Sequence, residues 1–561
     1  MLRVRHVGRV PYGEALVLQR ALAARAEDDY LLLLEHPHVY TLGVRADPAH
    51  VLVDPASVGA ELVAVDRGGD VTYHGPGQLV VYPVLTVADH PGAGPAHVRR
   101  LEQVVIDALE GLGVGGRVGG VGRHPGYPGI WLGTGTDRPR KVGAVGVRTV
   151  RAGGRRRTQH GLALNVHCDL SMFGHIVPCG IADLPVTSLA AEGLDLGMGE
   201  VAAAIAARAT EAWGRSGVEE QAVVGPPGSP AATAGPEAAA ADRAPLRRLR
   251  QAGVDPAAGL PARARKPEWL RVPARMGEDY LRLGRTVHDL GLVTVCEEAG
   301  CPNIYECWAE GTATFMVNGD RCTRACGFCQ VDTRKPLPLD PGEPARVAEA
   351  VDRMGLAHAV VTCVARDDLP DGGAGAIAAT VRAIRSRRPA TSVEVLVSDC
   401  KGDAASLATI VDARPDVLNH NVETVARLQR AVRPSAGYAR SLSVLARAAD
   451  AGLVVKSGLM VGLGEREDEV AATLADLRSV GVSIATVGQY LRPSARHLPV
   501  ARWWTPEELD RVAEAGRAAG LAHVEASPLT RSSYHARRAA TAAGVSAGSA
   551  PVPVRLTRAA G

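Results

Sequence analysis

The second half of the chain contains a dense group of cysteines, six of the ten within thirty-four residues. They form two triplets with different spacings, C-x4-C-x5-C at Cys296, Cys301 and Cys307 and C-x3-C-x2-C at Cys322, Cys326 and Cys329. A structural zinc site closes with four protein ligands, whereas a cubane iron–sulfur cluster bound by three thiolates keeps one iron open. Clustered cysteines in a cytosolic chain favour metal binding over disulfides. The spacing therefore predicts metal centres, and a zinc knuckle that borrows a distant His or Asp is the alternative for a lone triplet.

The length of 561 residues exceeds what one ordinary core supports and predicts two or three domains. Apolar residues make up 46% and charged residues 22%, as in soluble globular proteins. The net charge of +3 indicates neither a nucleic-acid nor a membrane partner, and no apolar run approaches the roughly 18 residues of a membrane span. Because the first residues also lack the long apolar stretch of a signal peptide, we predict a cytoplasmic protein.

Residues 1–220 contain many strand-like runs and few helical stretches, which favours an α+β domain around a mixed sheet. The strand-like runs are 30–34, 61–65, 79–85, 141–150 and 160–166, and the helical stretches are 14–26, 96–112 and 199–213. Residues 221–262 are rich in Pro, Ala and Gly and predict a mobile linker, since such a segment cannot bury a core.

Residues 263–561 form the third predicted segment, which becomes rhythmic from 312 onward. Strand-like runs at 314–317, 358–363, 393–398, 417–420, 454–461, 484–490 and 523–526 alternate with helical stretches such as 343–355, 375–387, 438–451, 466–480 and 506–519. Repeated βα units predict an α/β domain whose parallel sheet is closed or partly closed into a (β/α) barrel. The second cysteine triplet follows the first strand, at the end where such folds place their chemistry.

The cysteines belong to longer motifs, C-E-E-A-G-C-P-N-I-Y-E-C-W, G-T-A-T-F-M and G-D-R-C-T-R-A-C-G-F-C. The C-x3-C-x2-C spacing resembles the radical S-adenosylmethionine (SAM) superfamily, and the whole run is similar to lipoyl synthase nearly residue for residue. Further matching motifs are N-H-N-V-E-T at 419–424, K-S-G-L-M-V-G-L-G-E at 456–465, Q-Y-L-R-P-S at 489–494 and R-S-S-Y-H-A at 531–536. The resemblance implies a partial (β/α) barrel of the radical SAM type.

The resemblance also implies two [4Fe–4S] clusters. Cys322, Cys326 and Cys329 would hold the cluster that cleaves SAM, and Cys296, Cys301, Cys307 and Ser533 would hold an auxiliary cluster. An alkoxide is an unusual iron ligand, and a ligand that dissociates suits a cluster consumed as a sulfur donor. The implied reaction inserts two sulfurs into an octanoyl chain at C6 and C8, beginning with hydrogen abstraction by a 5′-deoxyadenosyl radical.

Two positions depart from the family's pattern. Cys363 stands where the family usually has Ser, and E-A-S-P at 525–528, with Ala526 and Ser527, replaces the usual Ser-Gly-Pro. Both lie near the expected SAM contacts and therefore bear on SAM affinity. The polar run Arg366, Asp367 and Asp368 at a strand end is expected to face cofactor or substrate. Cys363 and Cys400 are otherwise interpreted as small buried apolar residues.

Four motifs of the first half resemble lipoyl (octanoyl) transferase across residues 1–215. They are R-G-G-D-V-T-Y-H-G-P-G-Q at 67–78, K-V-G-A-V-G-V-R at 141–148, H-G-L-A-L-N-V at 160–166 and I-V-P-C-G-I at 176–181. The fold of that family is similar to that of biotin- and lipoate-protein ligases. The resemblance implies an acyl tunnel lined by Arg67, Gly68, Gly69, Asp70, Val71, Thr72, Tyr73, His74, Ala144, Val145, Gly146, Gly161, Leu162 and Ala163.

The family's nucleophile falls on Cys179 and its paired lysine on Lys141. A nearby ammonium lowers the pKa of a thiol and activates it for attack on a thioester. Only five residues of the chain are lysines, and Lys141 is the single one among the first 265 residues. A lysine kept in an arginine-rich chain suits proton transfer, which arginine cannot perform. Cys168 is a rival nucleophile, but it lies outside the P-C-G-I motif, and we favour Cys179.

The two resemblances imply consecutive steps on one protein-bound chain, first octanoyl attachment and then sulfur insertion. The implied partners are octanoyl-acyl carrier protein, the lipoyl domains of 2-oxoacid dehydrogenases and the glycine cleavage H protein, and an electron donor such as ferredoxin or flavodoxin. A linker that keeps the two halves together would favour transfer between them. Three alternatives remain: an ATP-dependent lipoate or biotin ligase in the first half, a non-catalytic module that docks lipoyl domains, and a structural zinc module in the cysteine-rich region.

Overall fold

The computed structural model describes residues 1–90, 92–178, 185–214, 216–223, 244–271, 278–294, 297, 301, 303–309 and 312–545. Contacts between Cα atoms divide the chain into two compact units, Met1–Ala231 and Ala232–Gly561. The dividing point lies inside the predicted linker 221–262. Residues 224–243 of that linker are outside the described part of the chain, whereas Ala244–Gln251 form helix α5 and belong to the second unit.

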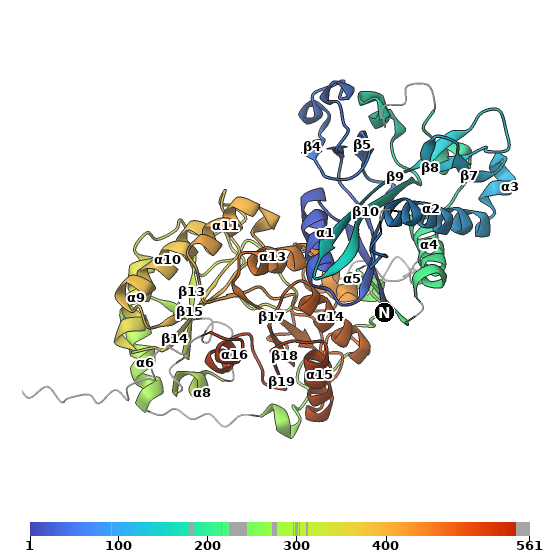
Figure 1. Cartoon of the computed structure of the whole chain (residues 1–561). Helices are drawn as coiled ribbons and strands as arrows, with labels where there is room; N and C mark the ends of the chain where they lie inside the picture. The colour runs from blue at the N-terminus through green and yellow to red at the C-terminus, as the bar shows by residue number, and fades with distance from the viewer. Residues whose placement is uncertain are drawn as a thin grey trace, which may run out of the picture. The chain divides into compact units, whose positions relative to one another are not determined.

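The main sheet of the first unit has the strand order β11-β1-β2-β6-β10-β9-β8-β7 and mixes parallel with antiparallel pairs. Figure 1 labels β7 to β10 of this sheet. Its strands are β1 (Leu2–Arg9), β2 (Asp29–Glu35), β6 (Gln78–Val84), β7 (Val121–His124), β8 (Tyr127–Leu132), β9 (Arg140–Ala152), β10 (Arg155–Asn165) and β11 (Val218–Ala222). The mixed-sheet prediction is confirmed. The sequence pattern failed to predict β1, because Arg3 and Arg5 look like surface residues. In the fold both are paired with Glu219 of the neighbouring β11.

Helices cover this sheet and supply its core. They are α1 (Tyr12–Arg25), α2 (Ala93–Gly111), α3 (Val114–Val118) and α4 (Met198–Trp213). Leu101 and Val105 of α2 and Ile205 of α4 are completely or almost completely buried against sheet residues such as Leu31 and Val81. Burying a side chain of this size stabilises a fold by about 1.5–3 kcal/mol relative to leaving it exposed. The apolar faces of α2 and α4 therefore fix the sheet that carries the candidate acyl site.

A smaller sheet, β4-β3-β5, extends the first unit next to the glycine-rich motif. Its strands are β3 (Val39–Leu42), β4 (Glu61–Ala64) and β5 (Val71–His74). The 3₁₀ helices of the first unit are η1 (Pro48–His50), η2 (Pro55–Val58), η3 (Leu170–His175) and η5 (Ala190–Glu192). Tyr40 of β3 and Tyr73 of β5 pack with Phe173 and Ile176 in a separate apolar cluster. This cluster joins the small sheet to the segment that leads into the predicted nucleophile motif.

Four buried histidines make the first unit sensitive to acid. Burial lowers the pKa of His36 and His97 to about 4 and that of His160 to about 3, and it lowers the pKa of His74 well below its usual range. The folded unit therefore keeps these rings neutral at pH 5, whereas the unfolded chain protonates them below about pH 6.5. Stability is then lost as the pH falls from about 6.5 towards 4.

We expect the first unit to lose on the order of 1–2 kcal/mol of stability per histidine between pH 7 and pH 5. Hydrogen exchange of the full chain, corrected for the intrinsic pH dependence of amide exchange, measures this loss peptide by peptide. His97→Gln serves as the reference variant, because His97 lies on α2 outside the predicted acyl-lining set. In this variant the loss of stability between pH 7 and pH 5 should be smaller by the contribution of one histidine. Equal protection at pH 7 and pH 5 would contradict the prediction.

The second unit is built around the strands β12-β13-β14-β15-β16-β17-β18-β19 in chain order, parallel from β13 onward. They are β12 (Val293–Thr294), β13 (Thr312–Val317), β14 (His358–Cys363), β15 (Ser392–Leu396), β16 (Val417–Asn419), β17 (Val454–Val461), β18 (Ile484–Gln489) and β19 (His523–Ser527). Strands β12 and β19 are the two edges of this order, so the sheet is open. This confirms the predicted α/β fold with a partial barrel.

Helices alternate with these strands and lie around the outside of the curved sheet (Figure 1). They are α5 (Ala244–Gln251), α6 (Glu278–Asp289), α8 (Ile304–Ala309), α9 (Glu343–Arg353), α10 (Ala374–Arg387), α11 (Ala404–Asp412), α12 (Gln429–Val432), α13 (Tyr438–Asp450), α14 (Glu467–Ser479), α15 (Pro506–Ala518) and α16 (Ala536–Ala542), with 3₁₀ helices η6 (Glu268–Leu270), η7 (Cys400–Gly402) and η8 (Ala426–Leu428). In the first unit, helical periodicity predicted the long helices within a few residues. In the second unit, the alternation of strands and helices predicted most of the long elements equally well.

Candidate functional sites

The glycine-rich loop of the first unit is held from two sides. The Arg67 guanidinium, which is buried, donates from Nη2 to the Thr41 backbone oxygen at 2.7 Å and to Thr41 Oγ1 at 2.8 Å. The N–H of Val44 donates to the Arg67 oxygen, and the N–H of Gly68 donates to Val147 of β9. The loop is therefore anchored to the small sheet at one end and to the main sheet at the other.

Strand pairing brings the other two predicted acyl-lining segments together. Ala144, Val145 and Gly146 of β9 lie directly opposite Ala163, Leu162 and Gly161 of β10. A Cβ atom on Gly146 would meet the Gly68 oxygen at 2.8 Å, and one on Gly161 would meet the Val81 oxygen at 2.0 Å. Only glycine permits these two close backbone approaches. The three segments that the resemblance assigns to one tunnel are thus adjacent in the fold.

Lys141 lies near the start of β9, on the strand that carries residues 144–146. Its side chain is buried, and its ammonium nitrogen is 5.7 Å from the centre of the Trp131 ring. The Lys141 N–H donates to the Pro185 oxygen, and the N–H of Thr187 donates to the Lys141 oxygen, both at 2.9 Å. The chain that follows the predicted nucleophile motif therefore returns alongside Lys141.

Cys179 itself lies outside the described residues, but its rival can be judged. The Cys168 thiol is buried, and burial raises its pKa to about 12, with the Cys168 backbone opposing the shift. A thiol with such a pKa is protonated at neutral pH and is a poor nucleophile. Cys168 packs in the apolar cluster of Tyr73 and Phe173, which suits a structural role.

In the second unit, Cys322, Cys326 and Cys329 occupy the loop that follows β13. The Thr323 N–H donates to the Ala365 oxygen at 3.0 Å, and the Gly327 N–H donates to the Val432 oxygen at 3.0 Å. The Leu498 N–H donates back to the Gly327 oxygen, also at 3.0 Å. Segments that follow β14, β16 and β18 thus hold the loop at the C-terminal end of the parallel strands, as the sequence predicts.

The three thiols of this loop are compatible with a cluster. Within the described ranges, no group of three or more His, Cys, Asp or Glu side chains is arranged to hold one metal ion. In a cubane each thiolate binds a different iron, so the sulfurs need not converge on one point. Burial raises the pKa of Cys326 to about 12, although Arg433 opposes the shift, and burial also raises that of Cys329. Bound iron would supply the positive charge that such thiols need to ionise.

The segment containing Cys301 and Cys307 packs against the R-S-S-Y-H-A motif, more than two hundred residues later in the chain. Asn303 Nδ2 donates to the Leu529 oxygen at 2.7 Å, and the Tyr534 hydroxyl donates to Glu306 Oε2 at 3.2 Å. The structure thereby brings two of the three cysteines of the first triplet to the motif that contains Ser533. Cys296 lies outside the described residues.

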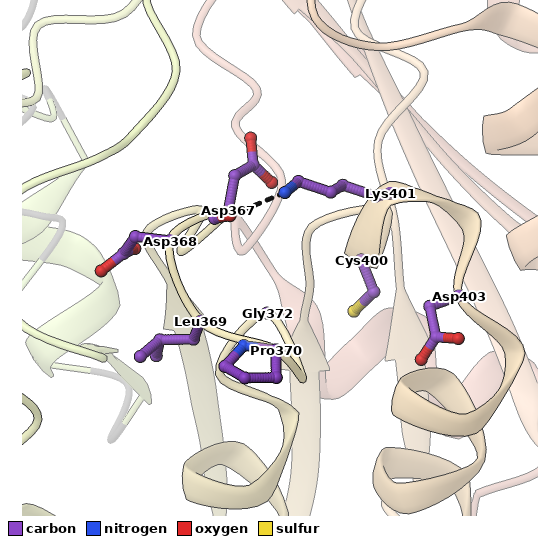
Figure 2. Close-up of a pocket in the computed structure, with 8 residues that line it drawn as sticks. All are labelled: Asp367, Asp368, Leu369, Pro370, Gly372, Cys400, Lys401 and Asp403. Atoms are coloured by element: carbon purple, nitrogen blue, oxygen red, sulfur yellow. Dashed lines mark hydrogen bonds between the residues drawn. The ribbon is translucent and has the colours of Figure 1, made fainter.

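A pocket of about 330 Å³ opens between the loops that follow β14 and β15. Figure 2 shows its lining: Asp367, Asp368, Leu369, Pro370, Gly372, Cys400, Lys401 and Asp403. Lys401 reaches across the rim to the Asp367 backbone oxygen at 2.6 Å. Arg366 binds both oxygens of Asp368 at 2.9 Å, and Asp403 caps α11 through the Ser406 N–H at 2.7 Å. The charged groups around this pocket are therefore engaged within the protein.

Burial keeps both of the other thiols in this region neutral. It raises the pKa of Cys363 to about 12 and that of Cys400 to about 11. This agrees with their interpretation as small apolar residues. Sequence reasoning missed Arg324 as a structural residue. Arg324 is part of the C-T-R-A-C motif, but the two carboxylates that it binds are 43 and 75 positions away in the chain, so the motif alone does not reveal them.

Two family models match the chain. The lipoyl protein ligase A/B catalytic domain matches residues 11–210, and the radical SAM superfamily matches residues 316–477. The first unit is therefore a lipoate ligase- or transferase-like domain, and the second is a radical SAM domain. Radical SAM membership implies an iron–sulfur cluster and SAM. In the part of the chain that the structure describes, no helix is both long and apolar enough to cross a membrane.

Relatives with similar sequences match about half of this chain. The lipoyl synthase of Rubrobacter xylanophilus is 56% identical over 273 residues, which are 48% of this chain and 85% of that protein. The lipoyl synthase of Mycobacterium bovis is 56% identical over 274 residues, 49% of this chain and 88% of that protein. A solved bipartite lipoate protein ligase from Thermoplasma acidophilum is 18% identical, with a TM-score of 0.32, over 39% of this chain and 86% of that one.

The fold and the cysteine loop thus define a radical SAM protein fused to a lipoate ligase- or transferase-like domain. The chain belongs to the lipoyl synthase family through its second half. Lipoyl synthase activity is accordingly the activity of that half, within lipoate biosynthesis.

Proposed function

We propose that the chain makes protein-bound lipoyl groups in two consecutive reactions. The first unit transfers octanoyl from octanoyl-acyl carrier protein to the lysine of a lipoyl domain, and the second unit inserts sulfur at C6 and C8 of that chain. The observation that carries the first half is that residues 144–146 of β9, the strand that bears Lys141, lie next to both loop 67–70 and residues 161–163 of β10. An apolar acyl chain needs such a lined path beside the group that handles protons.

In the proposed transfer, the Cys179 thiolate attacks the thioester carbon of the carrier protein. A sulfur–carbon bond to Cys179 forms, the carrier's sulfur–carbon bond breaks, and the Lys141 ammonium gives its proton to the departing carrier thiolate. The lysine amine of the lipoyl domain then attacks the enzyme thioester: an amide bond forms, the Cys179 sulfur–carbon bond breaks to restore the thiolate, and Lys141 takes the proton that the amine loses. Trp131, packed beside the ammonium, restricts the positions that Lys141 can occupy.

For the second unit, we propose that Cys322, Cys326 and Cys329 hold the cluster that works with SAM, and that Cys296, Cys301, Cys307 and Ser533 hold a second one. When bound, the clusters and SAM supply the radical that removes hydrogen from C6 and C8 and the sulfur that replaces it. This chain's own part is to bind, orient and exclude water. The packing of the R-S-S-Y-H-A motif on the segment 301–307 supports the second assignment.

The intact mass of an apo lipoyl domain tests this proposal. The domain is incubated anaerobically with the reconstituted protein, octanoyl-acyl carrier protein, SAM and a chemical reductant. A mass gain of one octanoyl group followed by two sulfurs is the expected result. Gain of octanoyl alone would contradict sulfur insertion and direct attention to Cys363 and residues 525–528. An unchanged mass would contradict the transferase assignment of the first unit.

The ligase alternative rests on the family model, which covers lipoyl protein ligases as well as transferases. A ligase consumes ATP to activate a free acid, whereas a transferase uses an acyl thioester without ATP. Octanoate with ATP therefore replaces octanoyl-acyl carrier protein in a parallel reaction. Modification with octanoyl-acyl carrier protein alone supports the transferase, and modification only with octanoate and ATP would establish the ligase.

A further inference from the structure

A buried arginine lies between two of the proposed cluster ligands, and no step of the proposed reaction uses it. The Arg324 side chain is only 7% exposed. Its Nε and Nη2 donate to the two oxygens of Asp367 at 2.8 Å each, and Nη2 also donates to Asp399 Oδ1 at 2.6 Å. One guanidinium of the loop between Cys322 and Cys326 is thus bound by two carboxylates.

The two carboxylates come from the ends of two neighbouring strands. Asp367 follows β14, and its backbone N–H donates to Thr323 Oγ1 at 3.0 Å, so a second hydrogen bond joins the loop to the strand end. Asp399 follows β15 and is almost completely buried. Lys401 links the two strand ends, because its ammonium donates to the Asp367 oxygen across the rim of the pocket in Figure 2.

A strained turn holds Asp399 in position. Cys400 and Lys401 have φ values of 44° and 53°, a left-handed conformation that non-glycine residues rarely adopt. Within this turn the Lys401 N–H donates to Asp399 Oδ1 at 3.0 Å, the same oxygen that accepts from Arg324. The turn therefore orders the carboxylate that binds the guanidinium.

We propose that Arg324 is the positioning residue of the cluster-binding loop, fixing it to the ends of β14 and β15 through Asp367 and Asp399. This inference rests on the proposed assignment of Cys322, Cys326 and Cys329 as cluster ligands. Arginine suits the role because its planar fork reaches two carboxylates at once, whereas a lysine ammonium is a single point charge.

Arg324, Asp367 and Asp399 also determine the net charge next to the proposed cluster. Without the guanidinium, Asp367 and Asp399 lose the cation that they share, and Asp399 keeps a longer contact with Arg440, at 3.9 Å. Net negative charge close to an iron–sulfur cluster disfavours its reduction. Arg324→Gln should therefore make the reduction potential more negative, whereas Asp399→Asn, which removes one negative charge, should make it less negative.

The test uses the full chain, reconstituted anaerobically, in a Cys301→Ala and Cys307→Ala background so that the second triplet holds the remaining cluster. Iron content, reduction potential and the electron paramagnetic resonance signal of the reduced cluster, with and without SAM, are measured. Arg324→Gln should shift the potential and the signal, and Arg324→Lys should fall between Gln and the parent.

Arg427→Gln is the matched control. Arg427 forms a bidentate pair with Glu469, at 2.7 and 2.8 Å, its side chain is 14% exposed, and it lies in η8 of the same unit. It should destabilise the fold to a similar degree while leaving the potential and the signal at parent values. Loss of iron in Arg324→Gln but not in Arg427→Gln also supports the positioning role. In that case the effect of charge on the reduction potential is measured in the Asp399→Asn variant.

Identical potentials and signals in Arg324→Gln and its parent would overturn the inference while leaving the ligand assignment intact. Shifts in the same direction in Arg324→Gln and Asp399→Asn would support the positioning role, because both changes loosen the loop, and would overturn the charge argument. A parent that binds no cluster would instead overturn the ligand assignment itself.

Discussion

Cys179→Ala is expected to abolish octanoyl transfer to an apo lipoyl domain, with a rate loss of about 10³-fold or more. The reason is that the thiolate is the group that takes the acyl chain in the proposed mechanism. Lys141→Ala should cost about 10²–10⁴-fold, as expected when a group that moves protons is removed. Lys141→Arg keeps the positive charge but cannot release a proton, so it should stay close to the alanine variant. The intact mass of the domain, followed in time, measures each rate.

Cys168→Ala is the matched control for this experiment. Its thiol is buried, with a pKa raised to about 12, so its removal leaves the nucleophile in place. The variant should transfer octanoyl at close to the parent rate, with a modest loss of stability from the small void. If Cys168→Ala were inactive and Cys179→Ala active, the nucleophile assignment would be reversed.

Lys456→Met is expected to destabilise the second unit by about 3–5 kcal/mol, the usual consequence of leaving one partner of a buried ion pair without the other. Lys456 and Glu394 are both completely buried inside the barrel, with Nζ 2.9 and 3.1 Å from the two Glu394 oxygens. Asn419 Nδ2 also donates to Glu394 Oε1, at 3.1 Å. Urea unfolding of the full chain without metal, followed by hydrogen exchange in β14 to β17, measures the change.

Acid provides a second test of the same pair. Burial opposes ionisation of Glu394, but Lys456 and His358 outweigh it and lower the pKa of the carboxyl to about 2. The stabilisation is therefore complete above the ordinary glutamate value of about 4.5 and is lost as the pH falls towards 2. Lys456→Met should abolish this part of the pH dependence. A variant that unfolds with the parent's pH profile would contradict the assignment.

A surface pair and a double variant are the controls. Arg353→Met removes the exposed partner of Glu349 on α9, and exposed pairs contribute at most about 1 kcal/mol. The combined Lys456→Met and Glu394→Met variant should recover much of the stability lost by Lys456→Met alone, because it removes the buried charge that the single change leaves behind.

The long elements follow from local pattern. The runs predicted at 358–363 and 454–461 coincide with β14 and β17, and the helix predicted at 343–355 is α9, Glu343–Arg353. Fully buried parallel strands have continuous apolar sequences, and the helices between them have one apolar face. The residues of each element are therefore enough to predict whether it is a strand or a helix. The short helix α11 (Ala404–Asp412) lies between β15 and β16, where the βα rhythm predicts a helix.

The candidate sites divide in the same way. The motifs around Lys141, Cys179 and the two cysteine triplets are contiguous in sequence, so they identified the family before any fold was considered. Residues 144–146 and 161–163 meet because of the antiparallel register of β9 and β10, and Gly146 owes its identity to the Gly68 oxygen that approaches it. The order of residues along the chain does not give the distances between such segments.

The sequence by itself determined the family, the cysteine ligand candidates and the α/β class of the second unit, because these depend on spacing along the chain. Tertiary structure alone decided that Asp367 and Asp399 converge on Arg324, that Glu394 pairs with Lys456, and that the motif 531–536 packs on the segment 301–307. Contacts between distant residues depend on which strand ends the sheet places side by side, and that order is fixed only when the whole barrel has packed.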